Sequence, residues 1–176
     1  DEPLIKKHIG LLEYDNGNFS AAINPLTEYL KIDPNDFDVL YTLGLTYQNI
    51  GKYDDALLSF QNALPRTTNK LECNMEIARV YLKKNDAKSA LTILKEIIAQ
   101  KQIKGAYALM GDASLQNKNV KDALYNYSKE RELHGNDKNV QEKIAQLHFQ
   151  NNAFAQSSLE YKRLLQIVPD HISARY

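Results

Sequence analysis

The sequence predicts an all-α fold in which helical hairpins follow one another along the chain. Three observations support this prediction. Apolar residues recur at intervals of three and four, turn-forming residues separate the apolar segments, and the arrangement repeats about every 34 residues. The composition agrees with a folded chain, because 43% of the 176 residues are hydrophobic and 25% are charged.

The pattern is clearest in residues 37–70. The motif L-x-x-L-G-x-x-Y begins at Leu40 and places its apolar positions on one face of a first helix. In a second helix, Ala56 is followed four residues later by Phe60. Because Gly44 and Ala56 are small, the two helices are expected to approach closely there, with large side chains filling the flanking space.

Between the two helices of each hairpin the repeat register places a turn residue, and a glycine or asparagine at this position can adopt a left-handed backbone. These turn residues are Gly17, Gly51, Asn85, Lys118 and Asn152. Where one hairpin ends and the next begins, the segment around Pro34 stops a helix, and Asp36 is predicted to cap the following one. Pro65 comes early in its unit, so we expect an irregular junction after the second hairpin.

This order of small, large and aromatic positions resembles the tetratricopeptide repeat family, whose repeat has 34 residues. The resemblance covers residues 3–171 and implies a right-handed solenoid whose first helices line a concave groove. The predicted repeats are 3–36, 37–70, 71–103, 104–137 and 138–171, together forming one solenoid domain, and residues 172–176 are predicted to start a further helix.

Catalytic or cofactor-binding motifs are not apparent. The sequence contains no glycine-rich phosphate loop, C-x-x-C, H-E-x-x-H or G-x-S-x-G motif, and its four histidines lack paired-ligand spacing. The single cysteine, Cys73, excludes a disulfide framework and is expected in the core. We therefore predict a protein that is not an enzyme and that uses neither a cofactor nor a metal.

The charge and hydropathy patterns bear on partners and location. The formal net charge is zero, so no electrostatic drive toward nucleic acid is visible, and no apolar run is long enough to cross a bilayer. The tyrosines could suggest base stacking, as in the related pentatricopeptide family, but most occupy repeat positions. We expect a soluble chain of the bacterial cytoplasm, or of the periplasm if a targeting segment has been removed.

A peptide segment or helix of a partner protein is predicted to lie in the groove. The candidate groove residues are those of the first helices that are not needed for packing against the second helix of the same hairpin. They are Lys7, Leu11, Tyr14, Asp38, Tyr41, Leu45, Gln48, Met75, Arg79, Leu82, Asp112, Gln146 and Phe149. The alternative is that some of them pack between adjacent repeats.

One activity of the family can be compared residue by residue. Some tetratricopeptide co-chaperones hold the terminal carboxylates of heat-shock chaperones with lysine, asparagine and arginine side chains. Lys7 matches the first lysine position, but Leu11 and Thr42 replace the two asparagines. Glu72 and Glu76 stand where a lysine and an arginine are needed, so the carboxylate clamp is predicted to be absent.

A second function remains open. The chain could be a structural or regulatory domain of a larger protein, or could self-associate through its terminal repeats. The apolar residues Leu164, Leu165 and Val168 near the end of the fifth repeat favour such a contact, because solenoid ends need a polar covering.

Overall fold

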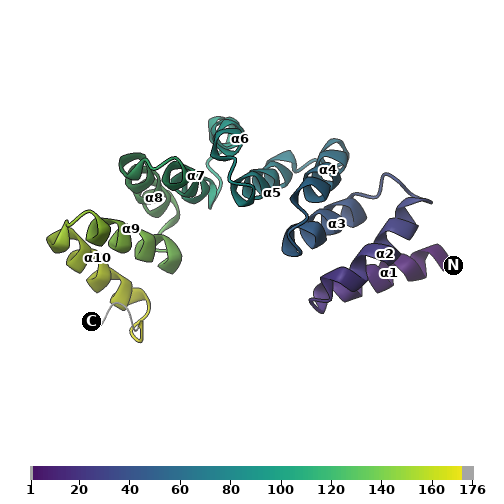
Figure 1. Ribbon diagram of the computed structural model, residues 1–176, viewed down its shortest axis with the longest axis horizontal. Coiled ribbons are helices and arrows are strands. Elements are labelled where there is room, and N and C mark those ends of the chain that lie inside the picture. The colour runs from purple at the N-terminus through teal and green to yellow at the C-terminus, as the bar shows by residue number, and fades with distance from the viewer. Residues whose placement is uncertain (1, 172–176) are drawn as a thin grey trace. The chain divides into compact units, whose positions relative to one another are not determined.

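The computed structural model of the protein describes residues 2–171, and all regular structure within this range is helical (Figure 1). The predicted start of a further helix at 172–176 lies outside the described residues. The elements are α1 (Glu2–Asp15), α2 (Phe19–Leu30), α3 (Phe37–Asn49), α4 (Tyr53–Ala63), the 3₁₀ turn η1 (Leu64–Arg66), α5 (Lys70–Lys83), α6 (Ala87–Gln100), α7 (Ala106–Gln116), α8 (Val120–His134), α9 (Lys138–Gln150) and α10 (Phe154–Ile167).

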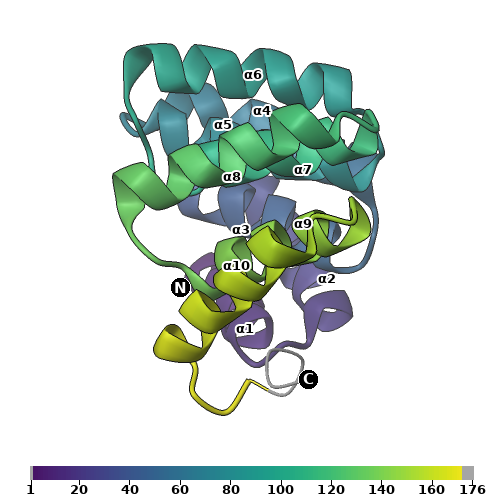
Figure 2. The same ribbon diagram turned by 90° about the vertical axis from the view of Figure 1, so that its left-hand side faces the viewer.

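The helices belong to two compact units, Asp1–Asp86 and Ala87–Tyr176. In the first unit, α1 pairs with α2, α3 pairs with α4, α2 packs on α3, and α4 packs on α5. In the second unit, α6 packs on α7, α7 pairs with α8, α8 packs on α9, and α9 pairs with α10 (Figure 2). The division falls inside range 71–103, and the repeat bounds given above stay a prediction.

Close approach of paired helices depends on glycine. A Cβ added at Gly44 would lie 2.7 Å from the ring of Phe60, and one at Gly111 would lie 2.5 Å from the ring of Tyr127. Both aromatic rings are fully buried. The small position in the first helix therefore receives the large side chain of the second, as the sequence predicts.

The turns within the hairpins have the predicted left-handed backbone. The φ angle is 77° at Gly17 and Gly51, 58° at Asn85 and Lys118, and 59° at Asn152. Glycine enters this region without a side-chain clash, and asparagine tolerates it better than most residues. The five turn positions are thus confirmed.

The connections between hairpins also follow the sequence. Asp36 caps α3, since its Oδ1 accepts a hydrogen bond from the Val39 amide at 3.2 Å. After α4 the chain does not turn directly into α5 but passes through η1 and an extended residue, Thr67. This segment is the irregular junction predicted from Pro65.

Each unit has its own apolar core. In the first unit, Ala22, Leu26, Tyr29, Val39 and Leu43 form a buried cluster that joins α2 to α3. An equivalent cluster joins α8 to α9 in the second unit.

Cys73 is 1% exposed, which confirms its predicted place in the core. Burial, reinforced by the negative charges of Glu76 and Glu72, raises the pKa of its thiol to about 11. The thiol is therefore protonated at neutral pH and is not poised for nucleophilic chemistry.

Candidate functional site

The first helices of the first unit, α1, α3 and α5, present most of the predicted groove residues. Asp38 is exposed, whereas Tyr41, Leu45, Gln48 and Arg79 are half-buried and keep part of their surface open. Leu11 and Tyr14 of α1 are also half-buried and pack against the cluster of α2 and α3. These predicted groove residues therefore lie on first helices, and each keeps part of its side chain accessible to solvent.

Two other predicted groove residues lie in the interior. Met75 is 4% exposed and Leu82 is 8% exposed, so neither offers a side chain to a partner. The helical spacing correctly put them on α5. It did not reveal that this helix is buried on more than one face, because only the fold decides which faces the neighbours cover.

Lys7 is held by the protein itself. Its Nζ lies 2.6 Å from Oδ2 of Asp36, and the hydroxyl of Tyr29 donates to the same oxygen at 3.1 Å. Burial alone would raise the pKa of Asp36, but the bonds from Lys7, the Val39 amide and Tyr29 outweigh it and lower the pKa. Lys7 thus ties α1 to the start of α3 and is not free to bind a carboxylate ligand.

A small pocket opens at the start of α3 and α5. It has a volume of about 140 Å³ and is lined by Phe37, Tyr41, Thr67, Asn69, Glu72 and Cys73. The rings of Phe37 and Tyr41 stack with centroids 5.4 Å apart, and the Tyr41 ring also meets Phe60 edge to face at 5.4 Å. One wall of the pocket is therefore a fixed pair of aromatic rings.

The lining of this pocket also includes a carboxylate, that of Glu72, and a second carboxylate follows it on α5. Glu72 is exposed and accepts a hydrogen bond from Nδ2 of Asn69 at 2.6 Å. One turn further along α5, Glu76 is half-buried and pairs with Nε of Arg79 at 3.1 Å. Burial raises the pKa of Glu76 despite the neighbouring guanidinium.

The carboxylates act on Tyr41 as well. Burial raises the pKa of the Tyr41 hydroxyl, and Glu76 and Glu72 raise it further. The same direction holds for Tyr14, whose pKa is raised by burial and by the charges of Asp15 and Glu76. Both tyrosines are therefore neutral near pH 7 and lie in a negative potential.

Three lining residues of this pocket were not predicted from the sequence: Phe37, Thr67 and Asn69. Phe37 stands four residues before Tyr41, and this aromatic pair at helical spacing was the available signal. Thr67 and Asn69 reach the pocket because η1 displaces the connection to α5. No sequence pattern reports that displacement.

The predicted groove residues of the second unit have other partners. Asp112 accepts a hydrogen bond from the Tyr127 hydroxyl at 2.5 Å and forms an ion pair with Lys143. Gln146 is exposed and donates to Glu142 at 3.1 Å. Phe149 is 57% exposed, with its ring 5.6 Å from that of Phe154. Two of the three predicted residues are thus engaged by side chains of their own unit, and Phe149 offers an accessible ring.

A second hollow lies on the second helices of this unit. It has a volume of about 460 Å³, and its lining is polar: Ser128, Arg131, Glu132, Asn136, Arg163 and Gln166. Its two arginines are engaged by Glu160. Nη1 of Arg131 donates to Oε2 of Glu160 at 2.7 Å, and Nη1 of Arg163 donates to Oε1 at 2.8 Å.

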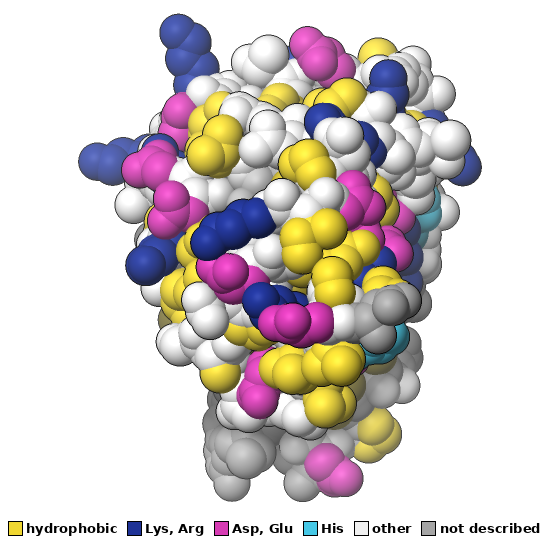
Figure 3. All heavy atoms as spheres, turned by 90° about the vertical axis from the view of Figure 1, so that its right-hand side faces the viewer, with side chains coloured by type: hydrophobic (Ala, Val, Ile, Leu, Met, Phe, Trp, Pro, Cys, Tyr) yellow, Lys and Arg dark blue, Asp and Glu magenta, His cyan; other side chains and the backbone are white. Residues whose placement is uncertain are grey.

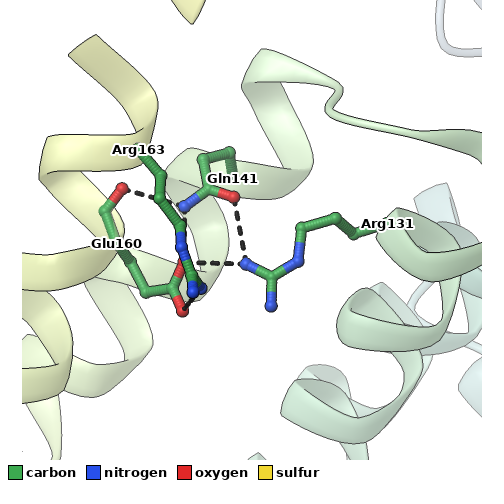
Figure 4. A network of polar contacts seen from close by, with 4 residues as sticks. All are labelled: Arg131, Gln141, Glu160 and Arg163. Atoms are coloured by element: carbon green, nitrogen blue, oxygen red, sulfur yellow. Dashed lines mark hydrogen bonds and ion pairs between the residues drawn. The ribbon is translucent and has the colours of Figure 1, made fainter. Parts of the chain in front are cut away.

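Gln141 completes this network (Figure 4). Its side chain is fully buried, and Nε2 donates to the carbonyl oxygen and to Oε2 of Glu160, at 2.8 and 2.6 Å. Burial alone would raise the pKa of Glu160. The hydrogen bond from Gln141 and the positive charge of Arg131 outweigh burial, with help from Arg163, and the pKa of Glu160 is lowered. The network fastens α8, α9 and α10 to one another.

Residues 2–171 contain no group of three or more histidine, cysteine, aspartate or glutamate side chains arranged to hold a metal ion. Within the same residues, no helix has the length and apolar character needed to cross a membrane.

Residues 26–57 match the sequence model of the tetratricopeptide repeat family. A TPR repeat-containing protein of Methanocaldococcus jannaschii is 43% identical over 53 residues, which are 30% of this chain and 17% of that protein. Residues 26–57 therefore have the sequence of a tetratricopeptide repeat. Because the aligned part is a small share of the archaeal relative, that relative's activity as a whole does not transfer to this chain.

Solved tetratricopeptide structures match nearly the whole chain. MamA of Desulfovibrio magneticus superposes with a TM-score of 0.82 at 19% identity and covers 98% of each chain. A thermophilic TPR protein of Thermus thermophilus superposes with a TM-score of 0.73 at 19% identity and covers 98% of this chain and 95% of its own. The predicted all-α tetratricopeptide fold is confirmed, and this fold is a protein-interaction scaffold in general.

Proposed function

We propose that the protein is a non-catalytic scaffold that binds a peptide segment of a partner protein on the first helices of its first unit. The pocket of Phe37, Tyr41 and Glu72 is the observation that carries this proposal. Its volume of about 140 Å³ is smaller than that of typical small-molecule sites, which span ~300–1,000 Å³. It has room for one side chain of a partner.

The chemistry of the pocket favours a lysine or arginine in that place. The face of an aromatic ring attracts a cation, and the pocket is lined by the stacked rings of Phe37 and Tyr41. The exposed carboxylate of Glu72 stands at the rim to pair with the same cation. A carboxylate ligand would be repelled by Glu72 and by Glu76.

The neighbouring side chains extend the surface along the helices. Leu45 and Gln48 follow Tyr41 on α3 at the helical spacing of three and four residues, and both are partly accessible. They offer one apolar and one polar contact beyond the pocket. A segment with a basic residue followed by an apolar one matches this order.

Peptide selection on the folded chain tests the proposal. Peptides from a random heptapeptide display library are selected on the full chain, and the dissociation constants of the selected peptides are measured by fluorescence anisotropy. We expect lysine or arginine to be enriched at one peptide position. Selection of acidic peptides, or of none, would overturn the proposal.

Two variants locate the binding site. Glu72→Gln removes the charge at an exposed position, and Tyr41→Leu removes the aromatic face while keeping an apolar contact with Phe60. Each is expected to weaken binding about tenfold, the loss of one anchoring contact. The matched controls Glu96→Gln on α6 and Tyr125→Leu on α8, both at exposed positions, should leave the affinity unchanged. Equal losses in variants and controls would contradict the site.

A further inference from the structure

Helix α1 exposes an apolar face. Leu4 is 47% exposed, Ile5 56%, Ile9 46% and Leu12 60%. These four are on one helix of 14 residues, whereas the exposed large apolar side chains elsewhere in residues 2–171 are scattered over several elements. Figure 3 shows hydrophobic side chains gathered among charged ones on the side of the molecule where α1 lies.

Three of these four positions, those of Ile5, Ile9 and Leu12, are buried in each of the other first helices. The alignment is fixed by the buried small residues Gly10, Gly44, Ala78, Gly111 and Ala145, one in each first helix. The residues equivalent to Ile5, Ile9 and Leu12 are Val39, Leu43 and Thr46 in α3; Cys73, Ile77 and Val80 in α5; Ala106, Met110 and Ala113 in α7; and Val140, Ile144 and Leu147 in α9, and all of them are buried.

The cause of this difference lies in the stacking of the hairpins. In the later first helices this face meets the second helix of the hairpin before it, as α2 packs on α3, α4 on α5, α6 on α7 and α8 on α9. Among the described residues no helix precedes α1. Its Ile5, Ile9 and Leu12 are nevertheless large and apolar, which is the composition of a covered face rather than of a polar end cap.

The order of residues on α1 identifies what can cover it. Ile5 and Leu12 stand on either side of Ile9 along the helix, so the apolar strip is nearly symmetric about Ile9. Lys6 and Glu13, two turns apart, lie along one edge of the strip. An antiparallel copy of α1 would set Ile9 on Ile9, Ile5 on Leu12 and Lys6 opposite Glu13.

These charges are available for such a contact. Lys6 makes an ion pair with Glu2 at 3.7 Å on the same helix, and Glu13 accepts a hydrogen bond from the exposed Asn18 at 2.8 Å. Both are surface contacts of small energy that a new partner can replace. The zero net charge of the chain adds no overall repulsion between two copies.

The other end of the chain is a poorer match for α1. The residue that follows the small position of the second helix is Ile23 in α2, Leu57 in α4, Leu91 in α6 and Leu124 in α8, each buried or half-buried. Ile23 and Leu124 pack against the clusters that join their helices to the next hairpin. In α10 the equivalent residue is Ser158, which is exposed. A head-to-tail contact of α10 on α1 would therefore lack an apolar side chain that each of the other second helices carries.

We propose that two copies of this chain associate through α1 in a two-fold, antiparallel contact centred on Ile9. A two-fold interface needs a patch that is complementary to itself, and the strip of Leu4, Ile5, Ile9 and Leu12 with its Lys6 and Glu13 edge satisfies this requirement. This surface of α1 is distinct from the peptide pocket of α3 and α5.

Sedimentation velocity of the full chain over a wide concentration range tests the dimer. The wild type is expected to show a monomer–dimer equilibrium, and Leu12→Lys is expected to raise the dissociation constant at least tenfold. Leu12 is 60% exposed, so the variant should fold, which circular dichroism checks. Leu58→Lys and Leu159→Lys, at positions 58% and 51% exposed, are the matched controls.

Charge exchange tests the antiparallel register. Lys6→Glu and Glu13→Lys should each weaken self-association, because like charges then meet across the contact. A mixture of the two variants should restore association as a heterodimer. In this arrangement the two charges of the first variant at positions 6 and 13, both negative, face the two of the second, both positive. Restoration is not expected if the loss came from misfolding.

Three results would overturn the inference. One is a wild-type chain that stays monomeric at all concentrations. That result would also be obtained if the apolar face of α1 binds a helix of a different protein instead of a second copy. Another is a dimer that Leu159→Lys abolishes and Leu12→Lys leaves intact, which would place the contact on α10. The third is a mixture of charge variants that does not associate. The Leu12→Lys variant should bind the peptide normally, and the Glu72→Gln variant should dimerise normally. A failure of the dimer proposal can therefore be distinguished from a failure of the peptide-binding proposal.

Discussion

At the scale of single residues, the small positions of the first helices determine how closely the hairpins pack. Gly44 touches the buried ring of Phe60 so closely that even a methyl group has no room. The sequence predicted that the two helices approach closely at Gly44, and the structure shows that the ring of Phe60 fills the space directly against it. The ion pair of Lys7 with Asp36 was not foreseen, since its partners are 29 positions apart.

Gly44→Ala tests this packing. Alanine gains about 0.5–1 kcal/mol over glycine in a helix interior. Overpacking a filled core costs about 1–3 kcal/mol, so we expect a net loss of roughly 1 kcal/mol in the free energy of unfolding, measured by urea denaturation.

The double variant Gly44→Ala with Phe60→Leu separates the two effects, because the smaller side chain makes room for the methyl group. Its loss should be less than the sum of the two single losses. If Gly44→Ala alone stabilised the protein, the ring of Phe60 would not be the constraint that the structure indicates.

At the scale of elements, polar networks join one hairpin to the next. Asp36 links α1, α2 and α3 through Lys7 and Tyr29, and Glu160 links α8, α9 and α10 through Arg131 and Gln141. A buried carboxylate with these partners is stabilised in its charged form. Each network therefore makes the packing of its helices depend on pH.

Glu160→Gln tests this dependence. The pKa of Glu160 is lowered in the folded protein, so its stabilising contribution is fully present above the ordinary glutamate pKa and is lost as the pH falls through the folded value. We expect the free energy of unfolding of the wild type to fall on acidification below about pH 5, and less steeply in the variant.

Glu132→Gln is the control for this experiment. Glu132 lies in the same unit with its side chain 65% exposed, so its removal should leave the pH dependence unchanged. Identical pH profiles for wild type and Glu160→Gln would show that the network contributes nothing to acid sensitivity.

Local patterns predicted the elements well and their surroundings less well. Helix faces and turns follow from residue spacing and backbone preferences, which act over a few residues, and Asn85 and Lys118 at the turns show this. Which face stays open depends on neighbours distant in sequence. Met75 was therefore expected in the groove and is buried, while the pocket formed by Phe37 and Asn69 depends on the path of η1.

At the scale of the whole molecule, the chain has the tetratricopeptide fold and no net charge, so the local distribution of charge decides what it attracts. Glu72 and Glu76 beside Tyr41 give the first unit an acidic, aromatic surface. The apolar strip of α1 gives the first unit a second surface, which is aliphatic and not acidic or aromatic. We thus propose partner binding at one surface and self-association at the other.

The central claim is that a basic peptide binds at the pocket of α3 and α5. Its most direct test is the titration of the ¹⁵N-labelled chain with a selected lysine- or arginine-containing peptide, followed by amide chemical shifts. The largest changes are predicted at Phe37, Tyr41, Thr67, Asn69 and Glu72, and they should be clearly smaller in Glu72→Gln at the same subsaturating peptide concentration. Shifts centred on α2, α4 or α8, or shifts of the same size in the variant, would contradict the account.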